Sequence, residues 1–262
     1  MILGVVPFAE ISAADITALA AIYFLAFFVR GMLGFGSAMP AVLFGAWLLP
    51  PHDAILLALV TSVYAQVQFL PQGFRDGDLR IVRPLIAGSA VSIVIGVWIF
   101  ATLKADWLTI VLGVLIGVSV AGEMAAVANR LTSRLDLRRF SVPFALASFS
   151  GLIGAIAGAG GIYVLSIYLR WAAPTPAVFR ATNILLSAFT NLWRAAVALA
   201  GGLISSTLAI EAALLMPVIL LGGWSGGKLS ARLTAKRYFR VYRILLLVAA
   251  TSLIWKGLNA LS

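Results

Sequence analysis

Two glycine-rich stretches decide the fold: Gly-Met-Leu-Gly-Phe-Gly-Ser-Ala-Met-Pro at residues 31–40, and Gly-Leu-Ile-Gly-Ala-Ile-Ala-Gly-Ala-Gly-Gly at residues 151–161. We call them the first break and the second break. Each interrupts a long apolar region and is followed by a short apolar run and then paired prolines. These prolines are Pro50, Pro51, Pro174 and Pro176. Helices interrupted at matching points of two halves are typical of transporters built from a duplicated unit, in which the interruptions line the substrate path.

The composition indicates that the chain lies in a membrane. Of its 262 residues, 62% are hydrophobic and 11% are charged, whereas a soluble domain has about 45–50% apolar and about 25% charged residues. The apolar runs are long and do not alternate, which favours helices over a barrel. Cysteine is absent and His52 is the only histidine, so we expect no metal cluster and no cofactor. The basic residues lie between apolar runs, so the net charge of +10 indicates membrane topology and not nucleic-acid binding.

Ten apolar segments form two repeats of five, which predicts an all-α polytopic membrane protein. Residues 1–128 form the first membrane repeat, 129–140 a basic cytoplasmic linker and 141–262 the second membrane repeat. The segments at 38–50 and 162–173 are too short to cross a bilayer alone, so we expect a broken or re-entrant helix at each glycine-rich break. The other segments are 14–30, 54–71, 84–101, 107–128, 141–157, 177–200, 208–227 and 241–260.

The distribution of positive charge predicts the orientation. Counted along the chain, the odd-numbered connections between segments hold most of the lysines and arginines, including the basic runs at 130–139 and 228–243. The side of the even-numbered connections holds Lys104 and Lys256. Because cytoplasmic connections are enriched in basic residues, both termini are expected outside the cytoplasm. Ten crossings, or six crossings with two re-entrant hairpins, satisfy this pattern, and both arrangements give two halves of inverted topology.

The breaks are the first candidate substrate-binding site. Glycine lets the backbone approach a ligand closely. A half-helix that begins after each break would present N–H groups and a positive dipole end to an anion. Close helix packing is the alternative for a single glycine motif, but the matched pair favours a substrate path. The candidate residues are Gly34, Gly36, Ser37, Gly158, Gly160 and Gly161.

Polar side chains on the segments after the proline pairs are the second candidate group. Arg180, Asn183, Ser187, Asn191 and Arg194 recur every three or four residues and share one helical face. Such a face avoids lipid, although the two arginines could instead extend to the headgroups. Hydroxyls and amides can donate hydrogen bonds to oxyanions, and interhelical hydrogen bonds are an equal alternative. The candidate substrate-binding residues here are Thr61, Ser62, Gln66, Thr182, Asn183, Asn191 and Arg194.

Arg30 adjoins the first break. In a full span it would lie at the cytoplasmic edge, and in a re-entrant hairpin it would lie deeper and could bind an anion. We favour the surface position and keep Arg30 among the candidate substrate-binding residues. No Asp or Glu lies clearly in mid-span, so the sequence shows no carboxylate relay for protons.

Both breaks resemble known signatures. Gly-x-x-Gly-Phe-Gly-Ser at residues 31–37 is similar to the first signature of the sulfite exporter TauE/SafE permeases, and residues 151–161, followed by Pro174 and Ala181-Thr182-Asn183, resemble the second. Ser37 and Asn183 depart from the glycine and serine common in that family. The resemblance covers nearly the whole chain. It implies a permease of the bacterial inner membrane that moves sulfite or small organosulfonates, commonly outward, and it leaves the oligomeric state open.

Two other functions remain as alternatives. A passive anion channel or facilitator fits the lack of a mid-span acid. A membrane enzyme has little support, because serine chemistry needs a base within hydrogen-bond reach of the nucleophile and the chain has one histidine. We therefore expect a transporter that is not an enzyme, with a small anion and the lipid bilayer as its partners.

Overall fold

The protein is helical in all the regular elements that can be described. The computed structural model describes residues 7–9, 11–33, 36–124, 141–159, 161–230, 247 and 250–259, and these contain helices and no strand. The predicted linker at 129–140 lies outside them. The helices are α1 (Ala13–Leu33), α2 (Ala38–Leu48), α3 (Pro51–Asp76), α4 (Leu79–Thr102), α5 (Ala105–Met124), α7 (Ser141–Ala157), α8 (Gly161–Ala172), α9 (Pro176–Ala200), α10 (Ser206–Leu214) and α11 (Met216–Ser230). Residues 250–259 are also helical.

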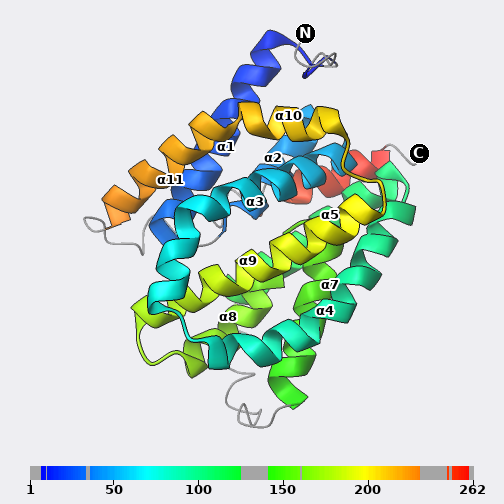
Figure 1. The fold of residues 1–262 in the computed structure, drawn as a ribbon. Helices are drawn as coiled ribbons and strands as arrows, with labels where there is room; N and C mark the ends of the chain where they lie inside the picture. The colour runs from blue at the N-terminus through cyan, green and yellow to red at the C-terminus, as the bar shows by residue number, and fades with distance from the viewer. Residues whose placement is uncertain are drawn as a thin grey trace.

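Within the described residues, four helices are long and apolar enough to cross a membrane, namely Ala13–Met32, Pro51–Asp76, Leu79–Thr102 and Ala177–Ala200, and the bent pair Ser206–Leu214 and Met216–Leu229 could form a fifth span. The two predicted short segments are confirmed as short helices. α2 has 11 residues and α8 has 12, and at about 1.5 Å per residue each is shorter than the roughly 30 Å hydrocarbon core. Each follows one of the breaks. The breaks therefore separate a longer helix from a half-length helix in both halves of the chain (Figure 1).

The predicted segment 208–227 is not one continuous helix. The structure divides it into α10 and α11, which are bent by 45° relative to each other. Pro217 follows the bend directly, and proline lacks the N–H that would continue the helical hydrogen bonds. Prolines do not end two other helices, since Pro71 lies inside α3 and Pro84 inside α4. Figure 1 shows that α3 changes direction in its second part, the expected effect of an internal proline.

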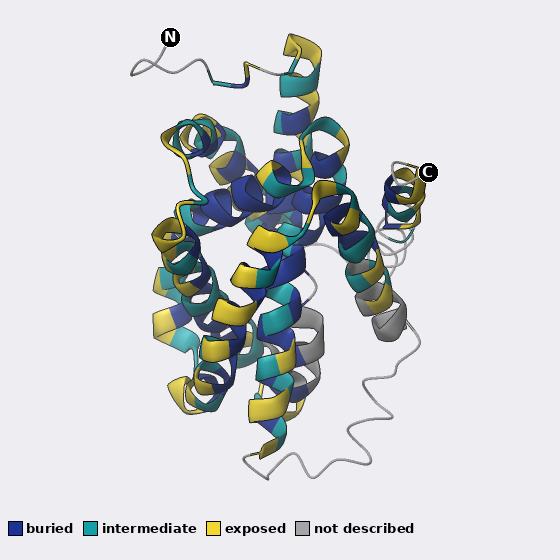
Figure 2. Ribbon diagram, turned by 90° about the vertical axis from the view of Figure 1, so that its right-hand side faces the viewer, coloured by how far each residue is buried: buried dark blue, intermediate teal, exposed yellow. Residues whose placement is uncertain are grey.

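Small residues bring three helix pairs into close contact. The backbone of α4 at Gly88 approaches Phe144 and Ala147 of α7, and the Ser148 hydroxyl donates to the Gly88 carbonyl at 2.8 Å. Gly31 of α1 lies against Gly223 of α11. α3 and α9 are antiparallel neighbours, because Gly73 lies beside Ile184 and Gly77 beside Ala181. Figure 2 shows that the sides of the helices that face one another are mostly buried.

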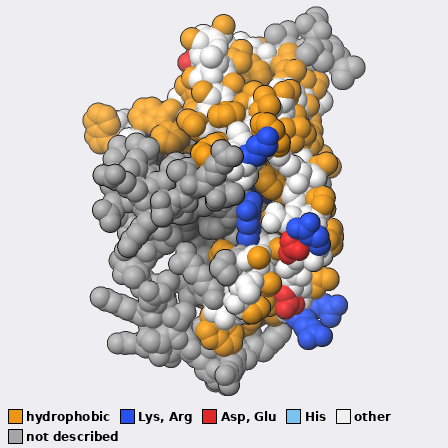
Figure 3. All heavy atoms as spheres, turned by 90° about the vertical axis from the view of Figure 1, so that its left-hand side faces the viewer, with side chains coloured by type: hydrophobic (Ala, Val, Ile, Leu, Met, Phe, Trp, Pro, Cys, Tyr) orange, Lys and Arg blue, Asp and Glu red, His pale blue; other side chains and the backbone are white. Residues whose placement is uncertain are grey.

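The outer surface suits a lipid environment. Large hydrophobic side chains are exposed along the helices, for example Val91, Ile95 and Leu199. Figure 3 shows a face that is mainly hydrophobic, with charged side chains gathered in a limited part of it. Several exposed tryptophans lie near helix ends, as expected at a membrane interface, whereas Trp193 and Trp224 are exposed in the middle of α9 and α11. Those near helix ends include Trp47, Trp98, Trp107 and Trp255.

Both ends of the molecule carry charged side chains. The turn between α3 and α4 carries exposed Arg75 and Arg80, and the first turns of α9 pack beside it through the hydrogen bond from the Asp78 N–H to the Thr182 hydroxyl. We call this the basic end. The opposite end, which we call the far end, contains Pro50 and Lys256, which line one surface hollow.

Candidate functional site

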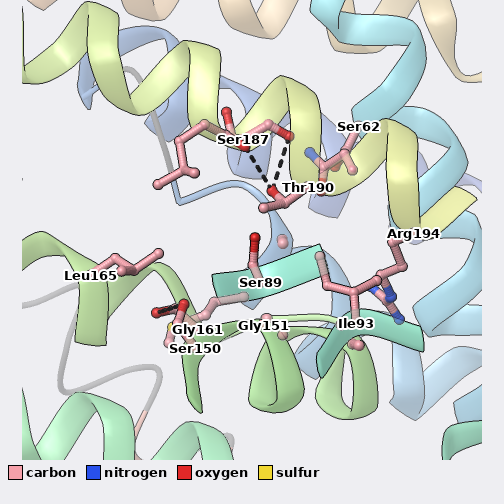
Figure 4. A pocket seen from close by; sticks show the side chains of 18 of the residues that line it. Ser62, Ser89, Ile93, Ser150, Gly151, Gly161, Leu165, Ser187, Thr190 and Arg194 are labelled. Carbon is pink, nitrogen blue, oxygen red and sulfur yellow. Dashed lines mark hydrogen bonds between the residues drawn. The ribbon is translucent and has the colours of Figure 1, made fainter. Parts of the chain in front are cut away.

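The two breaks meet at one internal cavity of about 120 Å³. Its wall includes residues of α1, α2, α3, α4, α7, α8 and α9 (Figure 4). The volume accommodates several waters or one small anion. Eight of the predicted residues line it: Arg30, Gly36, Ser37, Ser62, Gly158, Gly161, Asn191 and Arg194. Residues more than 150 positions apart in the chain are thus brought to one site.

Glycine is required at the breaks for two reasons. Gly36 has φ 95° and Gly158 has φ 71°, a left-handed conformation that costs other residues about 1–2 kcal/mol. Gly161 has no space for a side chain, because an added Cβ would overlap the Ser150 carbonyl oxygen. The Ser150 hydroxyl donates to the Gly161 carbonyl at 2.6 Å. The glycines of the breaks therefore allow close helix packing and also shape the cavity. Both interpretations offered by the sequence, helix packing and a lining role, apply to them.

The amino-terminal ends of both half-length helices lie in the cavity wall. Ser37, Ala38 and Met39 begin α2, and Gly161 begins α8. The Ser37 side chain makes no capping hydrogen bond. Helix amino termini carry partial positive charge and N–H groups without intrahelical partners. Both helix dipoles consequently favour negative charge in this cavity.

Arg30 is buried and lines the cavity. Its side chain is 3% exposed, so the surface position favoured from the sequence is wrong. The guanidinium lies 5.0 Å from the ring centre of Phe69 and 5.8 Å from that of Phe27. Its Nε and Nη2 atoms are buried without a hydrogen-bond partner. The rings compensate part of the desolvation of the charge, and the unpaired nitrogens remain available to a ligand.

Arg194 supplies a second buried cation to the same wall. It is 6% exposed and lines the cavity beside Asn191 and Thr190, so it does not extend to the headgroups. The ion pair between Arg75 and Asp76 lies at the surface, away from this wall. None of the described residues that line the cavity is acidic. Two arginines without a carboxylate make the cavity electrostatically suited to an anion.

The hydroxyl groups of the wall fall into two sets. Those of Ser89, Ser150, Ser187 and Thr190 donate to backbone carbonyls, and Figure 4 shows the bonds of Thr190 to the carbonyls of Leu186 and Ser187. Ser37 and Ser62 make no such hydrogen bond within the described residues. A bound oxyanion can therefore receive hydrogen bonds from Ser37 and Ser62.

Four predicted residues lie outside the cavity wall. The Thr61 hydroxyl donates to the Leu57 carbonyl at 2.7 Å, and the Thr182 hydroxyl accepts from the Asp78 N–H at 3.0 Å. Gln66 and Asn183 are buried, and their amide atoms have no partner. The binding roles of these four residues stay predictions. Gly34 and Gly160 lie outside the described residues.

Sequence reasoning did not select several wall residues. Ser89 and Ile93 come from α4, and Ser150, Gly151 and Gly154 come from α7. The repeated small residues Gly88, Ser92 and Gly96 on α4 were an available signal for a closely packed partner. They do not by themselves identify α7 as that partner, because the pairing joins opposite halves of the chain.

The comparison with protein families agrees with this site. The model of the family described as "Sulfite exporter TauE/SafE" matches residues 19–253. Searches of curated proteins and of solved structures give no match. The matched region includes both breaks and every described residue of the cavity wall. The chain therefore belongs to the sulfite exporter TauE/SafE family of membrane transporters and is not an enzyme.

Proposed function

We propose that the protein exports a small sulfur oxyanion such as sulfite or a small organosulfonate, and that it binds this anion in the central cavity. The observation that carries the proposal is the presence of Arg30 and Arg194, both buried, in a cavity wall without an acidic residue among those described. The two helix amino termini, Ser37 and Ser62 complete a set of donors. Charge-assisted hydrogen bonds of this kind compensate the loss of hydration of the anion.

The cavity has room for a small oxyanion. A volume of about 120 Å³ suits an anion of a few non-hydrogen atoms, and Ile93 and Leu165 supply an apolar part of the wall. A small organosulfonate could place its sulfonate among the donors and its carbon chain against these side chains.

Inverted repeats are part of the same proposal, with halves at residues 1–128 and 141–262 and a cytoplasmic linker at 129–140. Two correspondences support it: α3 and α9 begin at Pro51 and Pro176, and α2 and α8 both begin at the cavity. We place the basic end in the cytoplasm of a bacterial cell, because cytoplasmic segments are enriched in basic residues. Cysteines replacing Arg80 and Lys104 should be labelled from opposite sides of the inner membrane; labelling from the same side would contradict this topology.

A passive facilitator is the second candidate function. The described cavity wall offers no carboxylate that could carry a proton with the anion, which favours movement down the gradient of the substrate. Uphill accumulation driven by an imposed proton gradient in proteoliposomes would reject the facilitator and retain a coupled transporter.

Flux measurements test the proposal directly. Proteoliposomes containing the protein should move sulfite, and Arg30→Gln and Arg194→Gln should each lower the flux about 10–100-fold, because each removes charge-assisted hydrogen bonds worth about 1.5–3 kcal/mol. Lys228→Gln is the control, since Lys228 is exposed and stacks on Trp224. Equal flux in all four proteins, or no flux of any small sulfur oxyanion by the parent, would reject the proposal.

A further inference from the structure

The polar face of α9 continues beyond the cavity toward the basic end. Ser187 lines the cavity, Asn183 lies one turn earlier and Arg180 nearly one turn earlier again. Val178 lines a surface hollow at the basic end together with Arg80 and Arg83, and Asp76 and Asp78 line the same hollow. The distance along α9 from Val178 to Ser187 is about 14 Å at 1.5 Å per residue. Arg180 and Asn183 therefore lie between the surface hollow and the cavity.

Both side chains carry buried polar atoms without partners. Asn183 is 0% exposed, and neither its Oδ1 nor its Nδ2 atom has a hydrogen-bond partner. The Nε atom of Arg180 is also buried and unpaired. Leaving such groups unpaired is unfavourable, so their presence side by side on one helix face points to a ligand that pairs them in another state.

The remaining contact of Arg180 connects this face with the first break. Its Nη2 atom donates to the carbonyl oxygen of Gly31 at 2.8 Å. Gly31 lies in the last turn of α1 and follows Arg30, which lines the cavity. A cation at a helix carboxyl terminus stabilises the helix, and this explains the Nη2 bond. It does not explain the unpaired Nε of Arg180 or the unpaired amide of Asn183.

We propose that Arg180 and Asn183 form a second subsite for a small oxyanion, between the central cavity and the basic end. The inference rests on the transport function proposed above. In this structure the hydrogen bond from Arg180 to Gly31 closes the subsite. An arriving anion takes the place of the Gly31 carbonyl as the acceptor for Arg180 and receives the Nδ2 hydrogen bond of Asn183. The carboxyl end of α1 is then released from its hydrogen bond with Arg180. Because an anion can pair with Arg180 and a cation cannot, the path toward the cavity selects anions.

Thiol labelling tests this selection without a transport measurement. The chain has no cysteine, so Ser187→Cys places a single thiol in the cavity wall. Its labelling rates with a sulfonate-bearing and a trimethylammonium-bearing methanethiosulfonate are compared in inverted membrane vesicles. Adding Arg180→Gln should lower the anion-to-cation rate ratio about fivefold or more, as expected when one charge is removed close to the path. Arg180→Lys should retain the ratio.

The matched control is Lys228→Gln. It removes a positive charge from the residue after Gly227, where an added Cβ would lie 3.9 Å from the Gly31 carbonyl oxygen, but Lys228 is exposed. Its rate ratio should equal that of the single-cysteine protein. An unchanged ratio in Arg180→Gln, or an equal decrease in Lys228→Gln, would overturn the subsite.

Asn183→Leu provides a second test, in a variant that we expect to fold as stably as the parent protein. Because the amide atoms of Asn183 make no hydrogen bond, a leucine of similar size should leave the melting temperature equal or higher. In the Asn183→Leu variant, labelling of Ser187→Cys by the sulfonate reagent should slow about tenfold, because one charge-assisted hydrogen bond to the anion is lost. Unchanged labelling would contradict a ligand-binding role. Sulfite binding and flux by the parent protein test the central cavity separately, so failure of the subsite and failure of the proposed function are distinguishable.

Discussion

The Nη2 atom of Arg180 lies 2.8 Å from the carbonyl oxygen of Gly31, and this contact has a counterpart elsewhere in the molecule. Arg180 lies four residues after Pro176, where α9 begins, and Ile55 lies four residues after Pro51, where α3 begins. Ile55 packs against Gly158 of the second break. Each of these long helices thus contacts the break of the opposite half, with a polar side chain in one case and an apolar one in the other.

Replacement of Gly158 tests the apolar member of this pair. An added Cβ would lie 2.9 Å from Cγ2 of Ile55, and the residue has φ 71°. Gly158→Ala should therefore lower the free energy of unfolding by about 2–4 kcal/mol, measured by denaturation in detergent. Ile55→Ala in the same protein should recover part of this loss. Additive effects of the two substitutions would contradict the contact.

Gly154 provides a contrasting replacement in the same break. It lines the cavity, and the nearest atom to an added Cβ is 4.0 Å away. Gly154→Ala should be neutral or stabilising by up to about 1 kcal/mol, because alanine favours helix, while the narrower cavity lowers sulfite flux. Gly154→Leu should abolish flux in folded protein. Full flux in the leucine variant would remove this cavity from the substrate path.

We expect the side chain of Arg30 to strengthen sulfite binding and to lower the stability of the folded protein. Its charge is buried and its Nε and Nη2 atoms are unpaired. Replacing a buried charge by an apolar side chain of similar size is often neutral or stabilising by about 1–4 kcal/mol. Arg30→Met should therefore retain or raise the melting temperature and lower sulfite affinity about 10–100-fold. A strongly destabilised Arg30→Met protein would instead indicate a structural role for this arginine.

Thr182 should contribute to stability without contacting the anion. Its hydroxyl accepts the hydrogen bond of the Asp78 N–H in the turn between α3 and α4. Thr182→Val removes this acceptor and should cost about 1–3 kcal/mol, whereas Thr182→Ser should preserve it. Sulfite affinity in detergent should be the same in both variants and the parent. A selective loss of affinity in Thr182→Val would instead support the binding role predicted for Thr182 from the sequence.

Local patterns were enough to predict much of this architecture. Lengths of apolar runs identified α2 and α8 as half-length helices, because hydrophobicity and glycine placement are properties of short segments. The spacing of Ser187, Asn191 and Arg194 correctly placed them on one face, and all three line the cavity. The matched position of the two breaks selected the glycines that meet there.

Tertiary pairings account for what could not be predicted. Ser89 reaches the cavity because α4 packs against α7 of the other half, and no local feature of either helix identifies that partner. Thr182 and Asn191 were both predicted to bind substrate, yet the Thr182 hydroxyl accepts a hydrogen bond from the Asp78 N–H, because α3 and α9 lie antiparallel. The depth of Arg30 likewise depends on how far α1 extends beside α11. The positions of Ser89, Thr182 and Arg30 thus depend on contacts between helices that are far apart in the sequence.

Locating a bound anion is the most direct measurement of the central claim. Selenite is the selenium analogue of sulfite, and its selenium atom can be located by anomalous diffraction from crystals of the protein. The account predicts one anomalous peak in the central cavity, with the anion oxygens within about 3 Å of nitrogens of Arg30 and Arg194. A transport-competent protein that binds selenite only outside this cavity would contradict the account.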